Sequence, residues 1–295
     1  MQDSRMEIIR TVEWMKQIAQ EARLRGSVSG LVPTMGALHE GHFSLIRQAR
    51  RECSPVTVSI FVNPTQFGPA EDFQKYPRPF EADVAALGSL GADYLFAPTP
   101  EEMYPRGFGT SVNVEDLGDR LEGRSRPGHF RGVATVVLKL LEIVQPQLSF
   151  FGRKDAQQLR ILRQMVSDLN LDAKIVACPI ARAPDGLALS SRNAYLDAQE
   201  RKAAAALYRA LDGARQKVDA GERDAAALLA SLRSVLAAES HVKVDYAEIV
   251  DADSFEPVAT IRRDAFILLA AFVGRTRLID NAWIEAEGDV LRVTI

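Results

Sequence analysis

The stretch from residue 29 to residue 42, SGLVPTMGALHEGH, concentrates the residue types most capable of chemistry. We expect a short buried strand over residues 28–32 that ends at Pro33, because proline cannot donate to a central ladder. Met35-Gly36 is expected to form a tight turn, since glycine permits a backbone conformation that side chains block. A helix is expected to begin near Gly41.

His39 and His42 are three residues apart, so at a helix start they lie on one face. Two imidazoles beside unpaired backbone N–H groups and the positive end of the helix dipole suit a phosphate. Gly41 leaves room for a base or ribose to approach the backbone. One alternative is that the histidines only cap the helix or face solvent. A zinc site is a second alternative, but Cys53 lies too far along the chain to be a convincing third ligand.

Length and composition limit the class of protein. The chain has 295 residues, enough for two domains, with 47% hydrophobic and 25% charged residues as in soluble globular proteins. A net charge of −3 argues against a nucleic-acid partner. Residues 1–5 are polar and precede no signal core, and no run reaches the roughly 18 apolar residues that span a membrane. Cys53 and Cys178 form no disulfide framework, and Cys178 is expected to be inert core, so we expect a cytoplasmic protein.

Strands and helices alternate over the first 180 residues, which predicts a doubly wound α/β domain with a parallel sheet. In such sheets ligands bind beyond the carboxyl ends of the strands, which would gather the loops 33–42, 63–68 and 152–158. The expected strands are 28–32, 56–62, 93–97, 111–114, 147–151 and 173–180, and the expected helices are 11–25, 41–50, 79–88, 133–144 and 156–170.

The pattern changes after residue 180, where helices come first and strands follow. This order predicts a separate, smaller α+β unit, so we expect domains of residues 1–180 and 181–295. The expected helices are 198–220 and 225–238, and the expected strands are 242–250, 265–272, 276–284 and 290–295.

Two further stretches could contact a nucleotide. In Gly152–Gln158, Lys154 offers a mobile charge for phosphate, and Asp155 could orient a ribose or hold Mg²⁺ through water. A capping box between Asp155 and Gln158 would explain both residues without any function. In residues 189–193, LSSRN, two hydroxyls and a guanidinium can wrap a triphosphate and close over it as a lid, although Ser and Asn are also ordinary helix caps.

Neutral amides form another group, in Asn63, Gln66 and Gln158. Because amides both donate and accept, they suit a small polar substrate with hydroxyls and a carboxylate. Turn chemistry is the alternative, and it accounts for Asn63 but not for Gln66. Met35 could pack on an adenine, although core packing is the ordinary role of methionine. We interpret most of the basic segment that contains Arg124, Arg126, His129 and Arg131 as solvated loop.

Taken together, PTMGALHEGH (33–42), FVNPTQF (61–67), GRKDAQQ (152–158) and LSSRN (189–193) resemble the pantoate–β-alanine ligase family, in order and over essentially the whole chain. The resemblance implies a Rossmann-like N-terminal domain and a smaller C-terminal lid domain. It also implies an ATP-dependent ligase that joins (R)-pantoate to β-alanine through a pantoyl adenylate and releases AMP and diphosphate. Similar enzymes use Mg²⁺ and are cytoplasmic homodimers.

The same resemblance implies roles for particular residues. His42 would be the proton donor, Gln66 would contact pantoate and β-alanine, and Gln158 would contact pantoate, with Asn63 beside them. His39, His42, Lys154, Ser190, Ser191 and Arg192 are our hypothesis for the groups that hold the triphosphate and the departing diphosphate. ATP binding is expected at Met35, Gly36, Ala37, Leu38, His39, Glu40, Gly41, His42, Gly152, Arg153, Lys154, Asp155, Ala181, Leu189, Ser190, Ser191 and Arg192.

Two positions depart from the family pattern. Arg153 stands where the family usually has Glu, and Ala156 where it often has Tyr. Neither change removes a group that the chemistry needs, so we expect an effect on affinity rather than on activity.

Three other functions share part of the pattern. A nucleotidylyltransferase would have the histidine pair but would not need the amide loop at residues 63–67. A nucleotide-binding sensor would bind ATP without turnover. An aminoacyl-tRNA synthetase fits least, because the chain is short and its net charge gives no basic RNA-binding face.

Overall fold

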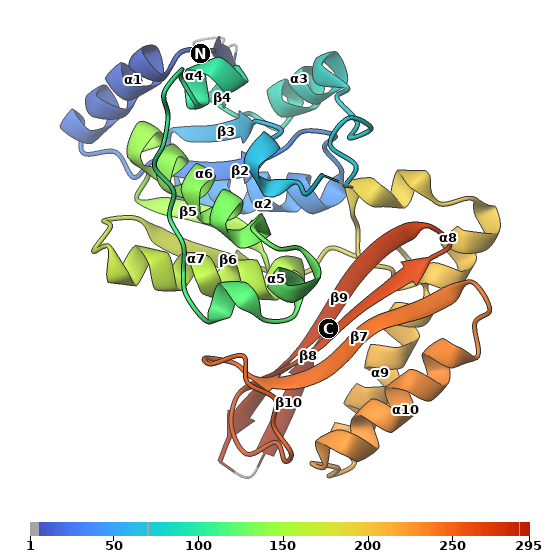
Figure 1. The fold of residues 1–295 in the computed structure, drawn as a ribbon. Coiled ribbons are helices and arrows are strands. Elements are labelled where there is room, and N and C mark those ends of the chain that lie inside the picture. Colours follow the sequence, from blue (N-terminus) through green and yellow to red (C-terminus); the bar gives the residue numbers. More distant parts are fainter. Residues whose placement is uncertain (1–5, 70, 289) are drawn as a thin grey trace. The chain divides into compact units, whose positions relative to one another are not determined.

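The computed structural model describes residues 6–69, 71–288 and 290–295, so the polar residues 1–5 considered above lie outside the described part. The chain divides into two compact units (Figure 1). The first comprises Met1–Arg153 and Gln157–Pro179, and the second comprises Lys154–Ala156 and Ile180–Ile295.

A six-stranded parallel sheet forms the centre of the first unit, with strand order β1-β4-β3-β2-β5-β6. From β2 the chain winds outward through β3 and β4, then returns to the other side of β2 for β5 and β6. This order confirms the predicted doubly wound α/β fold, and it puts the topological switch point between β2 and β5, where such sheets bind ligands. The strands are β1 (Glu7–Ile9), β2 (Gly30–Thr34), β3 (Val56–Ile60), β4 (Tyr94–Phe96), β5 (Leu148–Gly152) and β6 (Lys174–Cys178).

Helices cover both faces of this sheet. Neighbouring strand residues point to opposite faces, so Leu31 packs against α1, α6 and α7 while Val32 packs against α2 and α3. The apolar character of these strands is therefore explained by burial on both sides. The helices are α1 (Val12–Leu24), α2 (Glu40–Glu52), α3 (Phe80–Ser89), α4 (Pro100–Met103), α5 (Glu122–Ser125), α6 (His129–Val144) and α7 (Ala156–Asp168), with short 3₁₀ turns η1 (Pro64–Gln66), η2 (Leu117–Asp119) and η3 (Arg153–Asp155).

Pro33 lies inside β2, so the expectation that the strand ends at this residue is wrong. The carbonyl of Ser29 accepts hydrogen bonds on the β5 side, and the carbonyl of Thr34 accepts one on the β3 side. Alternation along the strand turns the ring nitrogen of Pro33 toward β5, where pairing is recorded only for Gly30 and Leu31. The missing N–H therefore falls on the side where the ladder has already ended.

Three other expectations differ from the structure. Residues 111–114 form no strand: the N–H of Val112 donates to Thr135 Oγ1 at 2.9 Å, so a side chain replaces the ladder partner. Helix α6 begins at His129, four residues before the expected start, because Gly128 at φ +82° ends the preceding turn. The short edge strand β1 was not expected, since its three residues show too little alternation.

The second unit is a four-stranded antiparallel sheet, in the order β10-β9-β8-β7, with helices packed on its apolar face. This confirms the predicted smaller α+β fold. The helix expected over 198–220 is two helices that meet at Ala205, and the alanine-rich sequence carries no signal for this break. The elements are η4 (Ser191–Tyr195), α8 (Ala198–Ala204), α9 (Ala206–Asp219), α10 (Ala225–Ala237), β7 (Val242–Asp251), β8 (Ala265–Val273), β9 (Thr276–Glu287) and β10 (Val290–Thr294).

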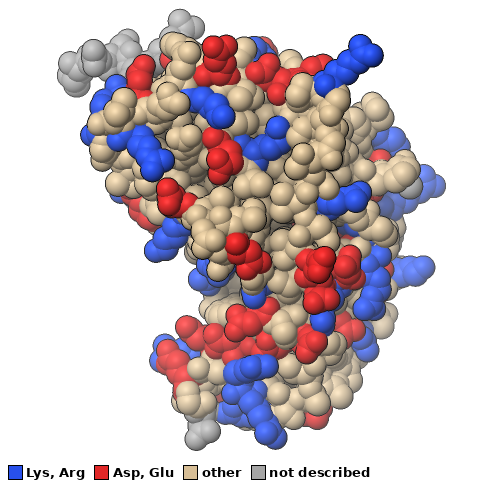
Figure 2. Space-filling view, turned by 60° about the vertical axis from the view of Figure 1, so that its left-hand side comes forward, with Lys and Arg blue, Asp and Glu red and all other residues tan. Residues whose placement is uncertain are grey.

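On the face shown in Figure 2, acidic and basic side chains are interspersed, in keeping with the small net charge of the chain. Among the described residues, no helix combines the length and apolar character needed to cross a membrane.

Candidate functional site

His39 and His42 lie together at the first turn of α2, with ring centroids 4.1 Å apart. His39 is the N-cap: its Nδ1 accepts the N–H of Gly41 at 3.1 Å, and His42 Nδ1 accepts the N–H of His39 at 3.3 Å. A ring nitrogen that accepts a hydrogen bond carries no proton, so the neutral rings both carry theirs on Nε2. The first turn of α2 therefore carries two imidazole Nε2–H donors.

This geometry corrects one part of the sequence interpretation. The backbone N–H groups of His39 and Gly41 are not left for a phosphate, because the two imidazoles cap them. The alternative that His39 and His42 cap the helix is thus right for their Nδ1 atoms. The donors that the histidines can offer an anion are their Nε2–H groups, which remain compatible with the predicted phosphate contact.

The loop between β2 and α2 is held by a buried carboxylate that the sequence interpretation missed. Asp83, on α3, accepts the N–H of Ala37 at 2.9 Å and of Leu38 at 2.8 Å, and it is only 4% exposed. Gly36 has φ +79°, and a Cβ there would lie 3.0 Å from Asp83 Oδ2. The turn therefore needs a glycine, and its shape is fixed from a different helix.

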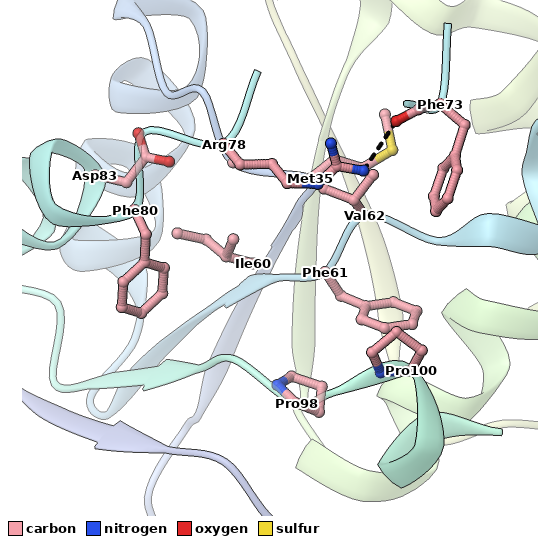
Figure 3. A pocket seen from close by; sticks show the side chains of 11 residues that line it. Met35, Ile60, Phe61, Val62, Phe73, Arg78, Phe80, Asp83, Pro98 and Pro100 are labelled. Atoms are coloured by element: carbon pink, nitrogen blue, oxygen red, sulfur yellow. Dashed lines mark hydrogen bonds between the residues drawn. The ribbon is translucent and has the colours of Figure 1, made fainter. Parts of the chain in front are cut away.

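A pocket of about 300 Å³ opens beside this loop, at the carboxyl ends of β2, β3 and β4 (Figure 3). Its wall is mainly apolar, with Met35 and Gly36 contributed by the nucleotide loop predicted from sequence. Arg78 also lines the pocket, and its guanidinium donates to the carbonyls of Phe73 and Tyr76, which fixes its position in the wall. None of the predicted amide residues lines it.

The amide loop follows β3 and is tightly bonded. Asn63 Nδ2 donates to Gln66 Oε1 at 3.1 Å, and Gln66 Nε2 contacts Met35 Sδ at 3.0 Å. Asn63 Oδ1 accepts from Thr65 and, at 2.8 Å, from the hydroxyl of Tyr104. The structure therefore brings the predicted substrate amides Asn63 and Gln66 to the predicted nucleotide residue Met35, within one unit. Tyr104 is a partner that sequence spacing could not identify.

Arg126 and His129 contact the amide loop and its neighbours, so the interpretation of the basic segment as solvated is wrong for these two residues. Arg126 makes two bonds to Glu71, of 2.8 and 2.6 Å, and its side chain is only 14% exposed. His129 contacts Arg126 through Nε2 at 3.0 Å and the carbonyl of Gln66 through Nδ1 at 2.8 Å. Arg124 and Arg131, by contrast, are exposed as expected.

Burial and the neighbouring Arg126 guanidinium lower the pKa of His129 to about 4, against an ordinary value of 6.5. We expect the C2–H resonance of His129 to show no titration between pH 5 and 8. Arg126→Met should raise the pKa toward 6.5, because a positive neighbour is removed, whereas Arg124→Met should leave it unchanged. An NMR titration of the three proteins checks this, and a midpoint near 6.5 in the unaltered protein would contradict it.

The end of β5 supplies the third predicted segment. Lys154 Nζ lies 3.8 Å from Asp155 Oδ1, and the carbonyl of Lys154 accepts a hydrogen bond from Asn281 Nδ2 at 2.8 Å within the second unit. Gln158 is half-buried, and Gln157 is buried and binds the main chain at Glu122, Leu117 and Arg120. Ala156 is buried.

The fourth segment is a hairpin in the second unit that pairs Ala181 with Leu189, both predicted to contact ATP. Arg182 anchors it, because its guanidinium donates to both oxygens of the buried Asp280 at 2.7 and 2.9 Å. Ser190 is the N-cap of η4 and accepts the N–H of Arg192, as the capping alternative held. Capping uses one lone pair of the hydroxyl and leaves it able to donate.

The predicted residues thus fall into two sets. The histidine loop, the amide loop, Gly152 and Arg153 belong to the first unit. Lys154, Asp155 and the hairpin with Ser190, Ser191 and Arg192 belong to the second. Among the described residues, no cluster of three or more His, Cys, Asp or Glu side chains is arranged to hold a metal ion.

A family model described as pantoate-beta-alanine ligase matches residues 7–283. The chain is 54% identical over 276 residues to the pantothenate synthetase of Thermotoga neapolitana, covering 94% of this chain and 99% of that protein. It is 49% identical to the pantothenate synthetase of Caldicellulosiruptor bescii, covering 96% of this chain and all of that protein.

Solved structures agree with these relatives. Pantothenate synthetase from Thermus thermophilus superposes with a TM-score of 0.89 at 46% identity, covering 94% of this chain and 98% of that one. The Francisella tularensis pantoate-beta-alanine ligase, complexed with beta-gamma ATP and beta-alanine, gives a TM-score of 0.77 at 37% identity, with 94% and 97% covered. The resemblance seen in the four sequence motifs is confirmed, and this chain belongs to the pantoate–β-alanine ligase family.

Proposed function

We propose that this chain uses ATP to condense (R)-pantoate with β-alanine, giving pantothenate, AMP and diphosphate. Family membership supports the reaction. The structural observation that supports it is that the histidine loop after β2 and the amide loop after β3 contact each other. The histidine pair caps the helix after β2, while Gln66 of the amide loop contacts Met35 of the same nucleotide loop. The histidines proposed to bind phosphate and the amides proposed to bind substrate thus follow neighbouring strands, at the same edge of the parallel sheet.

The first proposed step makes pantoyl adenylate. A carboxylate oxygen of pantoate attacks the α-phosphorus of ATP, the bond from that phosphorus to the bridging oxygen breaks, and diphosphate leaves with the electron pair. Negative charge grows on the departing group, so donors placed there lower the barrier. We assign this role to His39, His42 and Lys154 and, from the hairpin of the second unit, to Ser190, Ser191 and Arg192.

The second step forms the amide bond. The neutral amine of β-alanine attacks the acyl carbon of the adenylate, the bond from that carbon to the AMP oxygen breaks, AMP leaves with the electron pair, and the amine nitrogen releases a proton to solvent. Gln66 is proposed to orient both pantoate and the amine, with Asn63 holding the Gln66 amide in place and Gln158 contacting pantoate. The adenylate must be protected from water meanwhile, so we propose that residues 181–295 act as a lid domain over residues 1–180.

Magnesium is proposed to enter with the nucleotide. Mg²⁺ prefers oxygen ligands and retains several waters, so phosphates and one carboxylate suffice to hold it. Asp155 is a half-exposed carboxylate beside Lys154 and fits a water-mediated contact. Bound there, the ion would neutralise charge on the phosphates.

Isotope exchange between ATP and diphosphate tests the two-step scheme. We expect exchange to require pantoate and to proceed without β-alanine, because the adenylate forms before the amine attacks. AMP release should require both substrates. Exchange that depended on β-alanine would refute an adenylate formed first. A phosphomonoester that replaced pantoate would indicate a nucleotidylyltransferase, and ATP binding without turnover would indicate a sensor.

We also propose a cytoplasmic homodimer. The need for ATP supports the compartment, and Cys53 and Cys178 are both free and buried, as is usual in a reducing environment. The dimer is what the family resemblance implies, and sedimentation of the purified protein measures it directly.

A further inference from the structure

The ring of His129 lies between the main-chain carbonyl of Gln66 and the guanidinium of Arg126. A carbonyl oxygen can only accept, so Nδ1 carries the proton and donates to Gln66. A guanidinium can only donate, so Nε2 accepts from Arg126. The two contacts therefore specify one neutral tautomer, which is the opposite of that at His39 and His42.

We propose that His129 is a positioning residue that fixes the main chain at Gln66 and thereby sets the direction in which the Gln66 amide meets the substrates. The inference rests on the proposed function, in which Gln66 contacts pantoate and β-alanine. It adds a role for a side chain that neither the motifs nor the proposed contacts with ATP include.

Gln66 is held from both ends. Its side chain bonds to Asn63 and contacts Met35, whereas His129 holds its carbonyl. Helix α6 approaches so closely that a Cβ at Gly132 would lie 2.4 Å from the carbonyl oxygen of Thr65. His129 and Gly132 share one turn of this helix, so α6 acts as a rigid support for the amide loop.

Arg126 and Glu71 keep the ring in its donating form. Arg126 is fixed by its two bonds to Glu71, and its guanidinium faces Nε2, so protonation of Nε2 would remove an acceptor and place two positive charges together. Glu71 and Glu122 are the acidic groups that favour the charged ring, and burial together with Arg126 outweighs them. The contact with Gln66 therefore persists throughout the neutral pH range.

Three substitutions at His129 separate the two ring nitrogens. Asparagine places an amide N–H near the position of Nδ1, glutamine places its amide near Nε2, and alanine supplies neither. We expect His129→Ala to raise the KM for pantoate about tenfold while the KM for ATP changes less than about twofold. His129→Asn should restore most of the loss, and His129→Gln should not.

A double-substitution cycle completes the test. Because His129 acts through Gln66, His129→Ala should cost little more once Gln66→Ala is present. An equal loss in both backgrounds, an equal rise in every KM, or equal rescue by Asn and Gln would overturn the proposal. If His129→Ala does not fold, as judged by circular dichroism, the KM for pantoate of His129→Asn compared with that of His129→Gln decides whether the Nδ1 contact matters.

The same assays distinguish a failure of the positioning role of His129 from a failure of the proposed function. An unaltered protein that releases no AMP with pantoate and β-alanine would refute the ligase assignment. An active unaltered protein whose His129 variants keep its kinetic constants would refute only the positioning role.

Discussion

Replacement of His42 by alanine is expected to lower the rate of adenylate formation by about 100- to 1,000-fold. His42 Nδ1 accepts the N–H of His39, so the proton of the neutral ring lies on Nε2, which is therefore a hydrogen-bond donor. Removing one donor aimed at developing charge typically costs about 3–4 kcal/mol of barrier. Single-turnover measurement of diphosphate release with pantoate and ATP measures the effect on this step alone.

Two matched variants make the His42 result interpretable. His42→Gln places an amide N–H near the position of Nε2 and should recover part of the rate. His241, an exposed histidine of the second unit, serves as the control, and His241→Ala should behave like the unaltered protein. Near-native turnover in His42→Ala would remove this residue from the proposed chemistry.

Substitution of Asp83 is expected to have the second largest effect, because this one carboxylate accepts the N–H groups of both Ala37 and Leu38. In Asp83→Ala those two groups lose this buried acceptor, and we expect a loss of roughly 3 kcal/mol in the free energy of unfolding. The nucleotide loop is then less constrained, so the KM for ATP should rise by more than about tenfold. Urea unfolding and initial rates measure the two quantities.

Conservative and control variants accompany this experiment. Asp83→Asn keeps the shape and one acceptor oxygen, so its effects should be intermediate. Glu81 lies two residues earlier on the same helix and is exposed, and Glu81→Ala should change neither quantity. If Asp83→Ala lost stability but kept the KM for ATP, Asp83 would support the fold without shaping the nucleotide loop.

The architecture of the first unit could be predicted because most of its strands are short apolar runs separated by amphipathic helices. Burial on both faces, seen for Leu31 and Val32, makes such runs easy to recognise. Boundaries were less predictable where one residue has two possible effects. Pro33 ends a strand in most contexts, yet it fits β2 because its nitrogen faces the side where pairing stops.

The candidate site could be predicted only as far as local motifs extend. His39, His42 and Gln66 lie within short stretches whose residue types indicate their chemistry. Asp83 and His129 act on those stretches from helices that are distant in the sequence, and an isolated Asp or His on a helix carries no signal of such a contact. Long-range partners of this kind require the tertiary structure.

Pro33 also has a consequence for the pairing of β2 with β5 at the switch point. The ladder between these strands pairs Gly30 and Leu31, and Pro33 is the next residue of β2 whose main-chain nitrogen faces β5. An imino acid cannot take part in that pairing whatever the solvent, pH or bound ligand. The limit of this ladder is therefore set by covalent structure, independently of the charged groups that we propose for catalysis.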